Sequence, residues 1–454
     1  MKHILKALIL FTMILLLPAC TDNKNNPDKP PRTFEDTKES SNQTLPEKTE
    51  IIDVTHQPDT TQPTDPTEED KRNIINYKNM KAMWLSQFDL QNVYTNQGKQ
   101  REIDDFSKRM DVVLENVQKN GFNTVILQVR PYADSFYPSE IYPPSRYVTG
   151  SYQNDFLYDP LPIIIEKAHN MGLSVHAWIN PLRCMTTEEI NSIDDKYTIK
   201  QWSKQYEGTY LVAFNGRYYL NPAYPMPRQL IVDGIEELLT RYRFDGLHMD
   251  DYFYPTTAES FDSTAYFSYK TEGGTLTLKQ YRSENISTLV SSIYSTVKKI
   301  DRNIIYGISP EGNINNATDK AYADVYKWCS NEGYIDYICP QIYFGLEHQS
   351  WAFDKTANIW SDIIKNDDID LIIGMTFGKA LSKTDKWAGS GKDEWANNTD
   401  VMKRCLEFTS SLEKCKGVSV FCYQYYYDPI SAKEVTETKT ERDNFTAVLK
   451  NTEW

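Results

Sequence analysis

The amino-acid sequence predicts an α/β fold, a (β/α)8 TIM barrel, preceded by a signal peptide and a disordered tether. From Met80 onward, eight short apolar runs alternate with longer amphipathic segments. Such alternation implies right-handed βαβ units in a parallel sheet, and eight strands favour closure into a barrel. The competing fold, a doubly wound open sheet, usually has a glycine-rich first turn. The first run instead ends Ser86-Gln87-Phe88-Asp89.

The eight apolar runs are expected to be the barrel strands. They lie at Lys81–Phe88, Thr124–Arg130, Ser174–Asn180, Gly246–Asp251, Ile304–Ser309, Tyr337–Tyr343, Leu371–Phe377 and Val418–Tyr423. The helical segments between them lie at Asp104–Asn120, Pro160–Met171, Pro227–Tyr242, Thr277–Ile300, Asp319–Glu332, Ala352–Lys365 and Asn397–Lys414. The connections after the third, fourth and seventh strands are long, which is typical of functional segments. In a barrel they lie at the carboxyl-terminal rim, where active sites are found.

The first residues have the pattern of an export signal. Lys2 and Lys6 precede an apolar run at residues 7–17. This run is shorter than the roughly 20 residues of a membrane helix and suits a secretory signal. The run ends in the lipobox pattern Leu17-Pro18-Ala19-Cys20. We expect residues 1–19 to be removed and Cys20 to be lipidated, which anchors the protein at the extracytoplasmic face of the cell membrane. The alternative is an ordinary signal peptide with an incidental cysteine.

Residues 20–75 have the composition of a disordered linker. The segment is rich in Pro, Thr and charged residues and has one aromatic residue, Phe34. Such a chain cannot bury enough apolar surface to offset the entropy lost on ordering, and a tether of this length reaches roughly 40 Å. We expect the remaining residues, 76–454, to form the barrel as one domain.

Charge and cysteine usage argue against several functional classes. The formal net charge is −14, which makes the chain a poor candidate for binding nucleic acid. The cysteines beyond Cys20 form no CxxC pair, and no histidine stands at zinc-ligand spacing from them. We therefore expect no cofactor. Export permits disulfides, but the sequence does not reveal a pairing.

Polar side chains occupy the ends of the predicted strands. Because successive side chains alternate between the barrel interior and the helix layer, Leu247 and Met249 suit the helix layer, whereas His248 and Asp250 face inward. The same alternation turns five further side chains inward: Gln128, Arg130, His176, Trp178 and Asn180.

Acids at the ends of two successive strands indicate glycosidic bond hydrolysis. Asp250 ends the fourth run and Glu311 follows the fifth. Neighbouring strands can place two carboxylates about 5 Å apart, the separation found in retaining glycosidases. We interpret Asp250 as the nucleophile and Glu311 as the acid/base, while Asp251 reaches the mouth if the strand curls at its end. Arg130 would keep a nearby carboxylate ionised.

Other rim residues are candidates for binding sugar, because aromatic faces stack on sugar rings and tyrosine adds a hydroxyl partner. His176 and His248 would hydrogen-bond sugar hydroxyls or orient Asp250. The candidate substrate-binding residues are Arg130, Asp134, His176, Trp178, Asn180, His248, Tyr252, Gln341, Tyr343 and Tyr423.

Each candidate also has a simpler structural interpretation. An inward histidine can be a satisfied core residue, rim tyrosines can pack long loops, and Glu311 can be a solvated loop residue. Asp250 can cap the next element. Asp250 and Asp251 can also bind a metal ion, although no third acid is fixed near them in sequence.

The strand-end motifs resemble those of the glycosyl-hydrolase-like family 10, also called DUF187. They are Gln128-Val129-Arg130-Pro131 with Asp134, His176-Ala177-Trp178-Ile179-Asn180-Pro181, Gly246-Leu247-His248-Met249-Asp250-Asp251-Tyr252-Phe253-Tyr254-Pro255, Ser309-Pro310 with Gly312, and Pro340-Gln341-Ile342-Tyr343. The resemblance covers about residues 77–430. It implies a TIM-barrel glycosidase, commonly a lipoprotein, and at least one branch of the family cuts peptidoglycan strands stripped of stem peptides.

The resemblance also bears on the acids. It supports Asp250 and Asp251 as the central acids. Glu311 departs from the family, in which the residue between that Pro and Gly is not reliably acidic, so Asp134 or a loop acid is the alternative proton donor.

We therefore expect a lipid-anchored glycoside hydrolase that acts on an extracytoplasmic glycan, with peptidoglycan the first substrate to test and another polysaccharide the second. One alternative is a glycan-binding lipoprotein without catalysis. Another is metal-dependent hydrolysis at Asp250 and Asp251. A second acid close to Asp250 would favour catalysis over binding.

Overall fold

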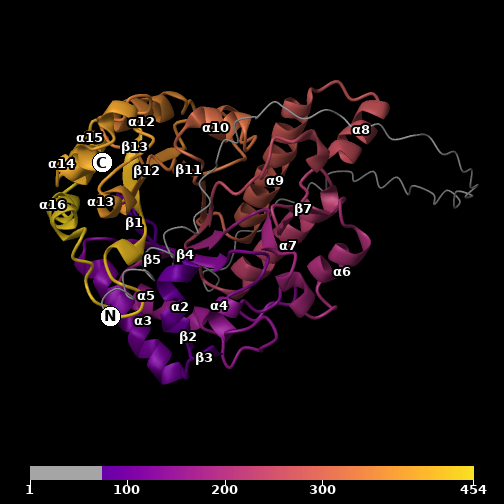
Figure 1. Cartoon of the computed structure of the whole chain (residues 1–454), viewed down its shortest axis with the longest axis horizontal. Helices are drawn as coiled ribbons and strands as arrows, with labels where there is room; N and C mark the ends of the chain where they lie inside the picture. Colours follow the sequence, from indigo (N-terminus) through magenta and orange to yellow (C-terminus); the bar gives the residue numbers. More distant parts are fainter. Residues whose placement is uncertain (1–73) are drawn as a thin grey trace, which may run out of the picture. The chain divides into compact units, whose positions relative to one another are not determined.

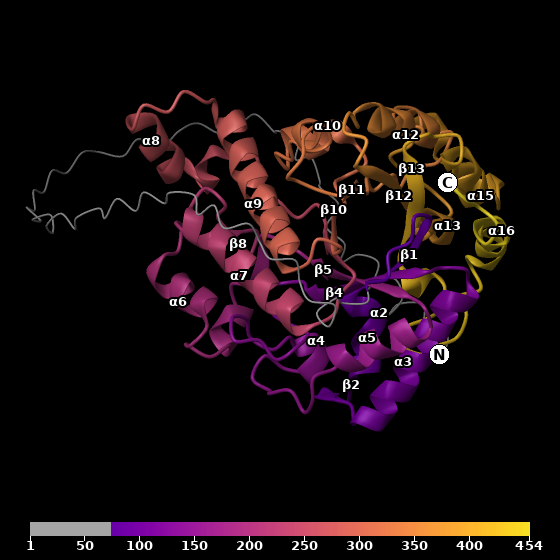
Figure 2. The same ribbon diagram turned by 180° about the vertical axis from the view of Figure 1, so that it is seen from behind.

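A computed structural model describes residues 74–454, which form a closed barrel of eight parallel strands surrounded by helices (Figures 1 and 2). The strands, in their order around the barrel, are β1 (Met80–Leu85), β4 (Thr124–Arg130), β5 (Ser174–Ile179), β9 (Gly246–Met249), β10 (Ile305–Ile308), β11 (Tyr337–Ile338), β12 (Asp370–Thr376) and β13 (Cys415–Phe421). This order is the chain order, so the sequence runs once around the ring, as the colours in Figure 1 show. The predicted barrel is confirmed. The predicted signal peptide and Cys20 lie outside the described residues.

Each of the eight predicted runs overlaps a strand of the barrel, and two of the differences at the ends have local causes. The first run ends early because Ser86 caps helix α2 (Gln87–Tyr94) in a capping box with Asp89. Strand β11 is short because Pro340 has no N–H to donate to the ladder. Bridging to the neighbouring strands resumes one residue later, at Gln341.

Helices cover the outer face of the barrel. The longer ones are α3 (Ile103–Lys119), α5 (Leu161–Asn170), α7 (Pro225–Arg241), α9 (Leu278–Ile300), α12 (Phe353–Asp362), α15 (Val401–Thr409) and α16 (Lys439–Leu449). The predicted helix Asp319–Glu332 is wrong: two short helices, α10 (Ile314–Asp319) and α11 (Val325–Trp328), take its place. Tyr322 between them has a φ of 59°, which a right-handed helix cannot include.

The predicted alternation of strand side chains is confirmed. Leu247 and Met249 belong to the large apolar cluster that the strands share with the helices. A second, smaller cluster fills the barrel interior and consists of Met80, Ala82, Trp84, Ile126, Trp178, Tyr337, Cys339, Ile372 and Cys422. The interior is therefore a packed core, and any substrate must bind at its mouth.

Three long connections extend the carboxyl-terminal rim, as expected. The connection after β5 contains helix α6 (Thr198–Gln205) and an antiparallel sheet of β6 (Arg183–Thr186), β8 (Arg217–Leu220) and β7 (Leu211–Phe214). The connection after β9 contains helix α8 (Ser263–Thr271). The connection after β12 contains helices α13 (Gly378–Ser382) and α14 (Glu394–Asn397).

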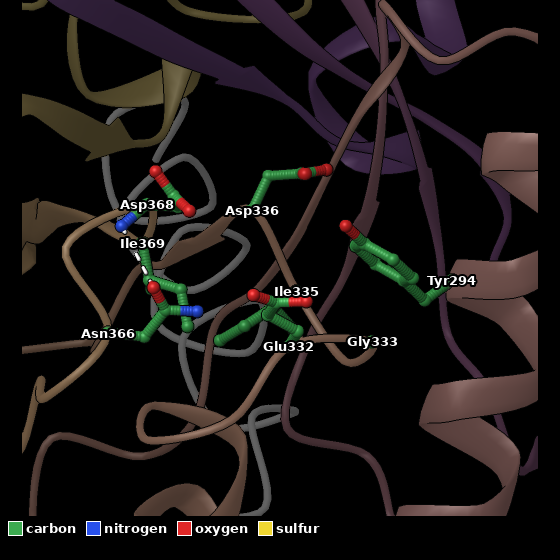
Figure 3. Close-up of a pocket in the computed structure, with 8 residues that line it drawn as sticks. All are labelled: Tyr294, Glu332, Gly333, Ile335, Asp336, Asn366, Asp368 and Ile369. Atoms are coloured by element: carbon green, nitrogen blue, oxygen red, sulfur yellow. Dashed lines mark hydrogen bonds between the residues drawn. The ribbon is translucent and has the colours of Figure 1, made fainter.

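A cavity of about 500 Å³ lies at the amino-terminal end of the barrel strands, opposite the carboxyl-terminal rim. Figure 3 shows the residues that line it. Its lining includes Asp336 and Ile369, which directly precede β11 and β12, together with Glu332 and Asp368. Because active sites of this fold lie where the strands end, the cavity is separate from the candidate site. No helix in the part of the chain that the structure describes has the length and apolar character needed to span a bilayer.

Candidate active site

Asp250 directly follows strand β9, and its carboxylate accepts three hydrogen bonds. Trp178 Nε1 donates to Oδ2 at 3.0 Å, and Asn180 Nδ2 donates to the same oxygen. The backbone N–H of Tyr252 donates to Oδ1 at 3.2 Å. Trp178 and Asn180 come from the end of β5, which pairs with β9. Asp250 is only 2% exposed, so these donors fix its orientation and favour its ionised form.

A relay of amide groups fixes Asn180 in turn. The backbone N–H of Gln87 donates to Gln128 Oε1 at 2.9 Å, and Gln128 Nε2 donates to Asn180 Oδ1 at 2.8 Å. Each amide oxygen accepts from the group before it, so its NH2 group points onward and the orientation of both amides is determined. The sequence predicted that Gln128 faces inward but not this role.

Asp251 and Glu311 supply two further carboxyl groups at the same rim, and both residues are half-buried. Desolvation and the charge of Glu311 raise the pKa of Asp251 to about 6, while Gln341 acts in the opposite direction. Glu311 accepts a hydrogen bond from Asn316 Nδ2 at 2.5 Å, and desolvation raises its pKa. Asp251 thus interacts electrostatically with Asp250 and also with Glu311.

The three acids can hold both a charge and a proton. Burial raises the pKa of Asp250 well above its usual value, and the charge of Asp251 raises it further. Carboxyl groups that repel one another in this way titrate together and keep a proton to higher pH than an isolated carboxyl. The three N–H donors act against this rise at Asp250, because they stabilise its charged form. Glycosidic hydrolysis uses such a combination of carboxylate and carboxylic acid.

Arg183 is a site residue that the sequence analysis missed. Its guanidinium lies over the ring of Tyr252, 4.3 Å from the centroid, and near the ring of Tyr132, 4.7 Å from its centroid. Its charge lowers the pKa of both Asp250 and Asp251, against the larger effect of desolvation. Arg183 stands three positions after Asn180 in the sequence. That proximity to a predicted site residue was the available signal.

The two histidines have a different partner from the one expected. His176 and His248 are fully buried, and Nδ1 of each contacts the Tyr337 hydroxyl, at 3.1 and 2.7 Å. Burial lowers the pKa of His176 to about 4 and also lowers that of His248, so both are neutral. Because the hydroxyl has one proton, one Nδ1 accepts from it and the other donates. They are core residues in this structure, out of reach of a sugar and not bonded to Asp250.

Arg130 and Asp134 form hydrogen bonds with the backbone near the carboxyl-terminal ends of strands β4 and β5. Arg130 Nη2 donates to the carbonyl oxygens of Asn180, at 2.9 Å, and Pro181, at 3.2 Å. Asp134 is fully buried and accepts from the backbone N–H of Tyr132 at 2.9 Å. Burial raises its pKa to about 6 although Arg130 acts in the opposite direction. Arg130 thus braces the end of β5, and the carboxylate whose ionised form it favours is Asp134, which is not open to a substrate.

The remaining candidates divide into two groups. Tyr252 is 36% exposed, and Tyr343 and Gln341 are half-buried, so these three stay candidates for substrate contact. Tyr423 is 4% exposed, and its hydroxyl accepts from Asn116 Nδ2 of helix α3 at 3.0 Å. The interpretation of Tyr423 as a rim residue is therefore wrong, because the chain turns toward the helix layer after β13.

Fold and site together define a (β/α)8 barrel with acids at its carboxyl-terminal mouth, where active sites of this fold lie. Among residues 74–454, no three His, Cys, Asp or Glu side chains are grouped as ligands for one metal ion. The chain belongs to the family described as Glycosyl hydrolase-like 10, whose model matches residues 79–388. The resemblance of the strand-end motifs to this family is confirmed.

Two bacterial relatives share much of the sequence. Glycosyl hydrolase YngK of Bacillus subtilis (strain 168) is 34% identical over 323 residues, which are 67% of this chain and 61% of that protein. Glycosyl hydrolase DigH of Escherichia coli (strain K12) is 29% identical over 348 residues, which are 71% of this chain and 77% of that protein. The chain thus spans about three fifths of the Bacillus protein.

Solved structures share the fold at low sequence identity. The PgaB (BpsB) glycoside hydrolase domain from Bordetella bronchiseptica has a TM-score of 0.51 and 13% identity, covering 81% of this chain and 98% of that one. The catalytic domain of β-amylase from Paenibacillus polymyxa has a TM-score of 0.50 and 10% identity, covering 82% and 99%. At these identities the likeness supports the barrel fold.

Proposed function

We propose that this protein hydrolyses glycosidic bonds in an extracytoplasmic glycan through the acids at the barrel mouth. The observation that supports this most strongly is the Asp250 carboxylate, which is fixed by three N–H donors and adjoins Asp251, which in turn interacts with Glu311. A protein that only binds glycans has no need of a second acid beside Asp250. The neighbouring Asp251 and Glu311 therefore favour catalysis over binding alone.

In this proposal Asp250 acts as the carboxylate. Once Asp251 or Glu311 carries the shared proton, the repulsion on Asp250 falls and its three N–H donors stabilise the charge. The charged Asp250 then attacks the anomeric carbon, and the bond to the leaving oxygen breaks as the protonated acid gives that oxygen its proton. The same acid, now a carboxylate, takes a proton from the water that cleaves the glycosyl–Asp250 bond and releases the sugar. Asp251→Asn and Glu311→Gln separate the two candidate donors, because only loss of the true donor removes the basic limb of the pH–rate profile.

We propose peptidoglycan glycan strands as the substrate to test first. The proposal is supported by the family to which the chain belongs and by the export signal predicted from the sequence. Soluble products from glycan strands, but not from other bacterial polysaccharides, would support it. Cleavage of another polysaccharide alone would reassign the substrate while retaining the reaction.

The lipid anchor is a separate proposal. We propose that Cys20 is acylated and holds the protein at the extracytoplasmic face of the membrane. Cells grown with labelled palmitate should incorporate label into the wild type, and Cys20→Ser should remove the label and release the protein from the membrane fraction. Cys184→Ser is a matched control, because Cys184 is buried in the barrel domain. Equal labelling of Cys20→Ser and the wild type would contradict the anchor.

A further inference from the structure

Arg183 places a guanidinium group without an ion-pair or hydrogen-bond partner among the described residues at the mouth of the site. It is half-buried, and its guanidinium packs on Tyr252 and Tyr132. Nothing from residue 74 to residue 454 forms an ion pair with this guanidinium or accepts a hydrogen bond from it. Stacking engages the faces of a guanidinium and leaves the N–H groups at its edge available.

The surroundings hold Arg183 in place. The hydroxyl of Tyr132 accepts a hydrogen bond from Gln87 Nε2 at 3.1 Å. A second arginine, Arg217, lies 4.4 Å from the Tyr132 centroid. The two arginines differ in one respect: Arg217 Nη1 donates to the carbonyl oxygen of Cys184 at 2.5 Å. Arg217 thus has one donor group engaged by the protein, whereas all the guanidinium donors of Arg183 are without a protein partner among the described residues.

We propose that Arg183 binds a carboxylate substituent of the substrate, so that the enzyme prefers a glycan built from acidic sugars. The inference rests on the proposed glycoside hydrolase function and names the class of substrate for that site. Asp250, Asp251 and Glu311 would repel an anionic sugar. A planar cation beside them offsets this repulsion and offers paired N–H donors that match a carboxylate.

A competing explanation assigns Arg183 to the acids alone. Its positive charge lowers the pKa of Asp250 and Asp251, so its loss would alter catalysis on any substrate. The two explanations differ in one measurable quantity, the ratio of activity on a charged glycan to activity on its neutral counterpart. Only carboxylate binding makes that ratio depend on Arg183.

The experiment uses the full-length protein and two forms of one glycan. The first is peptidoglycan strands stripped of stem peptides, in which each muramic acid has a free lactyl carboxylate. The second is the same strands with these carboxylates converted to neutral methylamides. We expect the wild type to prefer the carboxylate form. Arg183→Gln should reduce this preference roughly tenfold or more, mainly through KM, because hydrogen bonds between charged groups are strong.

Two further variants sharpen the result. Arg217→Gln removes a cation from the same tyrosine ring and should reduce the preference several-fold less than Arg183→Gln does. Arg183→Lys keeps the charge but not the paired donors, so an intermediate preference is expected. If Arg183→Gln lost activity equally on both forms of the glycan strands, the proposal would be overturned. Arg183 would then act only through its electrostatic effect on the acids.

Binding measurements separate this inference from the proposed function. Affinities of the Asp250→Asn protein, with and without Arg183→Gln, are measured for both strand forms. Hydrolysis without any preference for the carboxylate form would overturn the inference and retain the glycosidase. Preferential binding that depends on Arg183, without hydrolysis by the wild type, would retain the inference and overturn hydrolysis of these strands. Absence of both hydrolysis and preferential binding would overturn both.

Discussion

The side chain of Asn180, at the end of strand β5, donates a hydrogen bond to Oδ2 of Asp250, at the end of the neighbouring strand β9. The carboxylate is thus oriented by a residue of the rigid barrel. Loops move more easily than barrel strands, so a carboxylate held from a strand end is better fixed for catalysis than one held from a loop.

Replacement of Trp178 by phenylalanine should shift the acid limb of the pH–rate profile upward. The Trp178 N–H stabilises the ionised Asp250 carboxylate and lowers its pKa. Without the N–H, the pKa of Asp250 rises, so the ionised form and the activity appear only at higher pH. A hydrogen bond to a charged group contributes enough for a shift of roughly one pH unit.

Trp84→Phe is the matched control for this prediction. Trp84 is also buried in the barrel, but its Nε1 donates to Ser419 Oγ at 3.1 Å, not to an acid. It should leave the position of the acid limb unchanged. The same shift in both variants would show that loss of packing, not loss of the hydrogen bond to Asp250, is the cause.

Replacement of Asp251 by asparagine should stabilise the fold at neutral pH while impairing hydrolysis. The pKa of Asp251 rises from 3.8 to about 6 on folding. Between these values the folded state binds more protons than the unfolded state, so stability falls as pH rises and stays lower above pH 6. We expect a gain of about 1–2 kcal/mol at pH 7, measured by urea denaturation.

The pH dependence of this gain is the internal check. At pH 3.5, below the unfolded pKa, Asp251 is mostly protonated in both states, and the stability of Asp251→Asn should come close to that of the wild type. Asp155→Asn, at an exposed loop residue, should change the free energy of unfolding at neither pH. A loss of stability in Asp251→Asn at pH 7 would show that the carboxylate is favourably paired in the fold.

Replacement of Tyr337 by phenylalanine should destabilise the protein without a comparable loss of activity. The Tyr337 hydroxyl is the partner of both buried histidines, His176 and His248. Its removal leaves two buried ring nitrogens unpaired, at a cost of about 1–3 kcal/mol. Calorimetry and kcat/KM measured on the same samples check the prediction.

Tyr306→Phe provides the comparison. Tyr306 is fully buried on the adjacent strand β10, and its hydroxyl has no hydrogen-bond partner among the described residues. Its removal should be neutral or slightly stabilising. If Tyr337→Phe instead lost activity as severely as Asp250→Asn while remaining folded, the two histidines would have to be interpreted as part of the catalytic site.

The barrel could be predicted from the sequence because its signals are local. Alternation along Gly246–Met249 separates the interior from the helix layer without knowledge of any partner strand. The helix predicted at Asp319–Glu332 was wrong because the structure there depends on contacts that are distant in sequence. The turn at Tyr322 is held by tertiary contacts, including a hydrogen bond from Arg282 Nη1 to its hydroxyl at 2.9 Å, and such contacts leave no periodic signal.

The sequence indicates candidate acids but not their partners. Asp250, Asp251 and Glu311 stand at strand ends, and parity turns Asp250 inward, whereas Asp251 has the opposite parity and reaches the mouth only where the strand curls. Which side chain meets which depends on register across the barrel. His248 and Asp250 share a face, yet His248 lies one layer deeper and meets Tyr337. Arg183 lies in the β6–β8 insertion, whose position relative to the acids no sequence rule specifies.

The measurement that tests the central proposal most directly is product analysis with denuded peptidoglycan glycan strands. Full-length wild type and Asp250→Asn are incubated with the strands, and new reducing ends and soluble oligosaccharides are quantified. We predict products from the wild type and a decrease of roughly a hundredfold or more in Asp250→Asn, with unchanged thermal stability as the sign of an intact fold. Equal product formation by both proteins would contradict the role of Asp250. Absence of products from both would contradict hydrolysis of these strands.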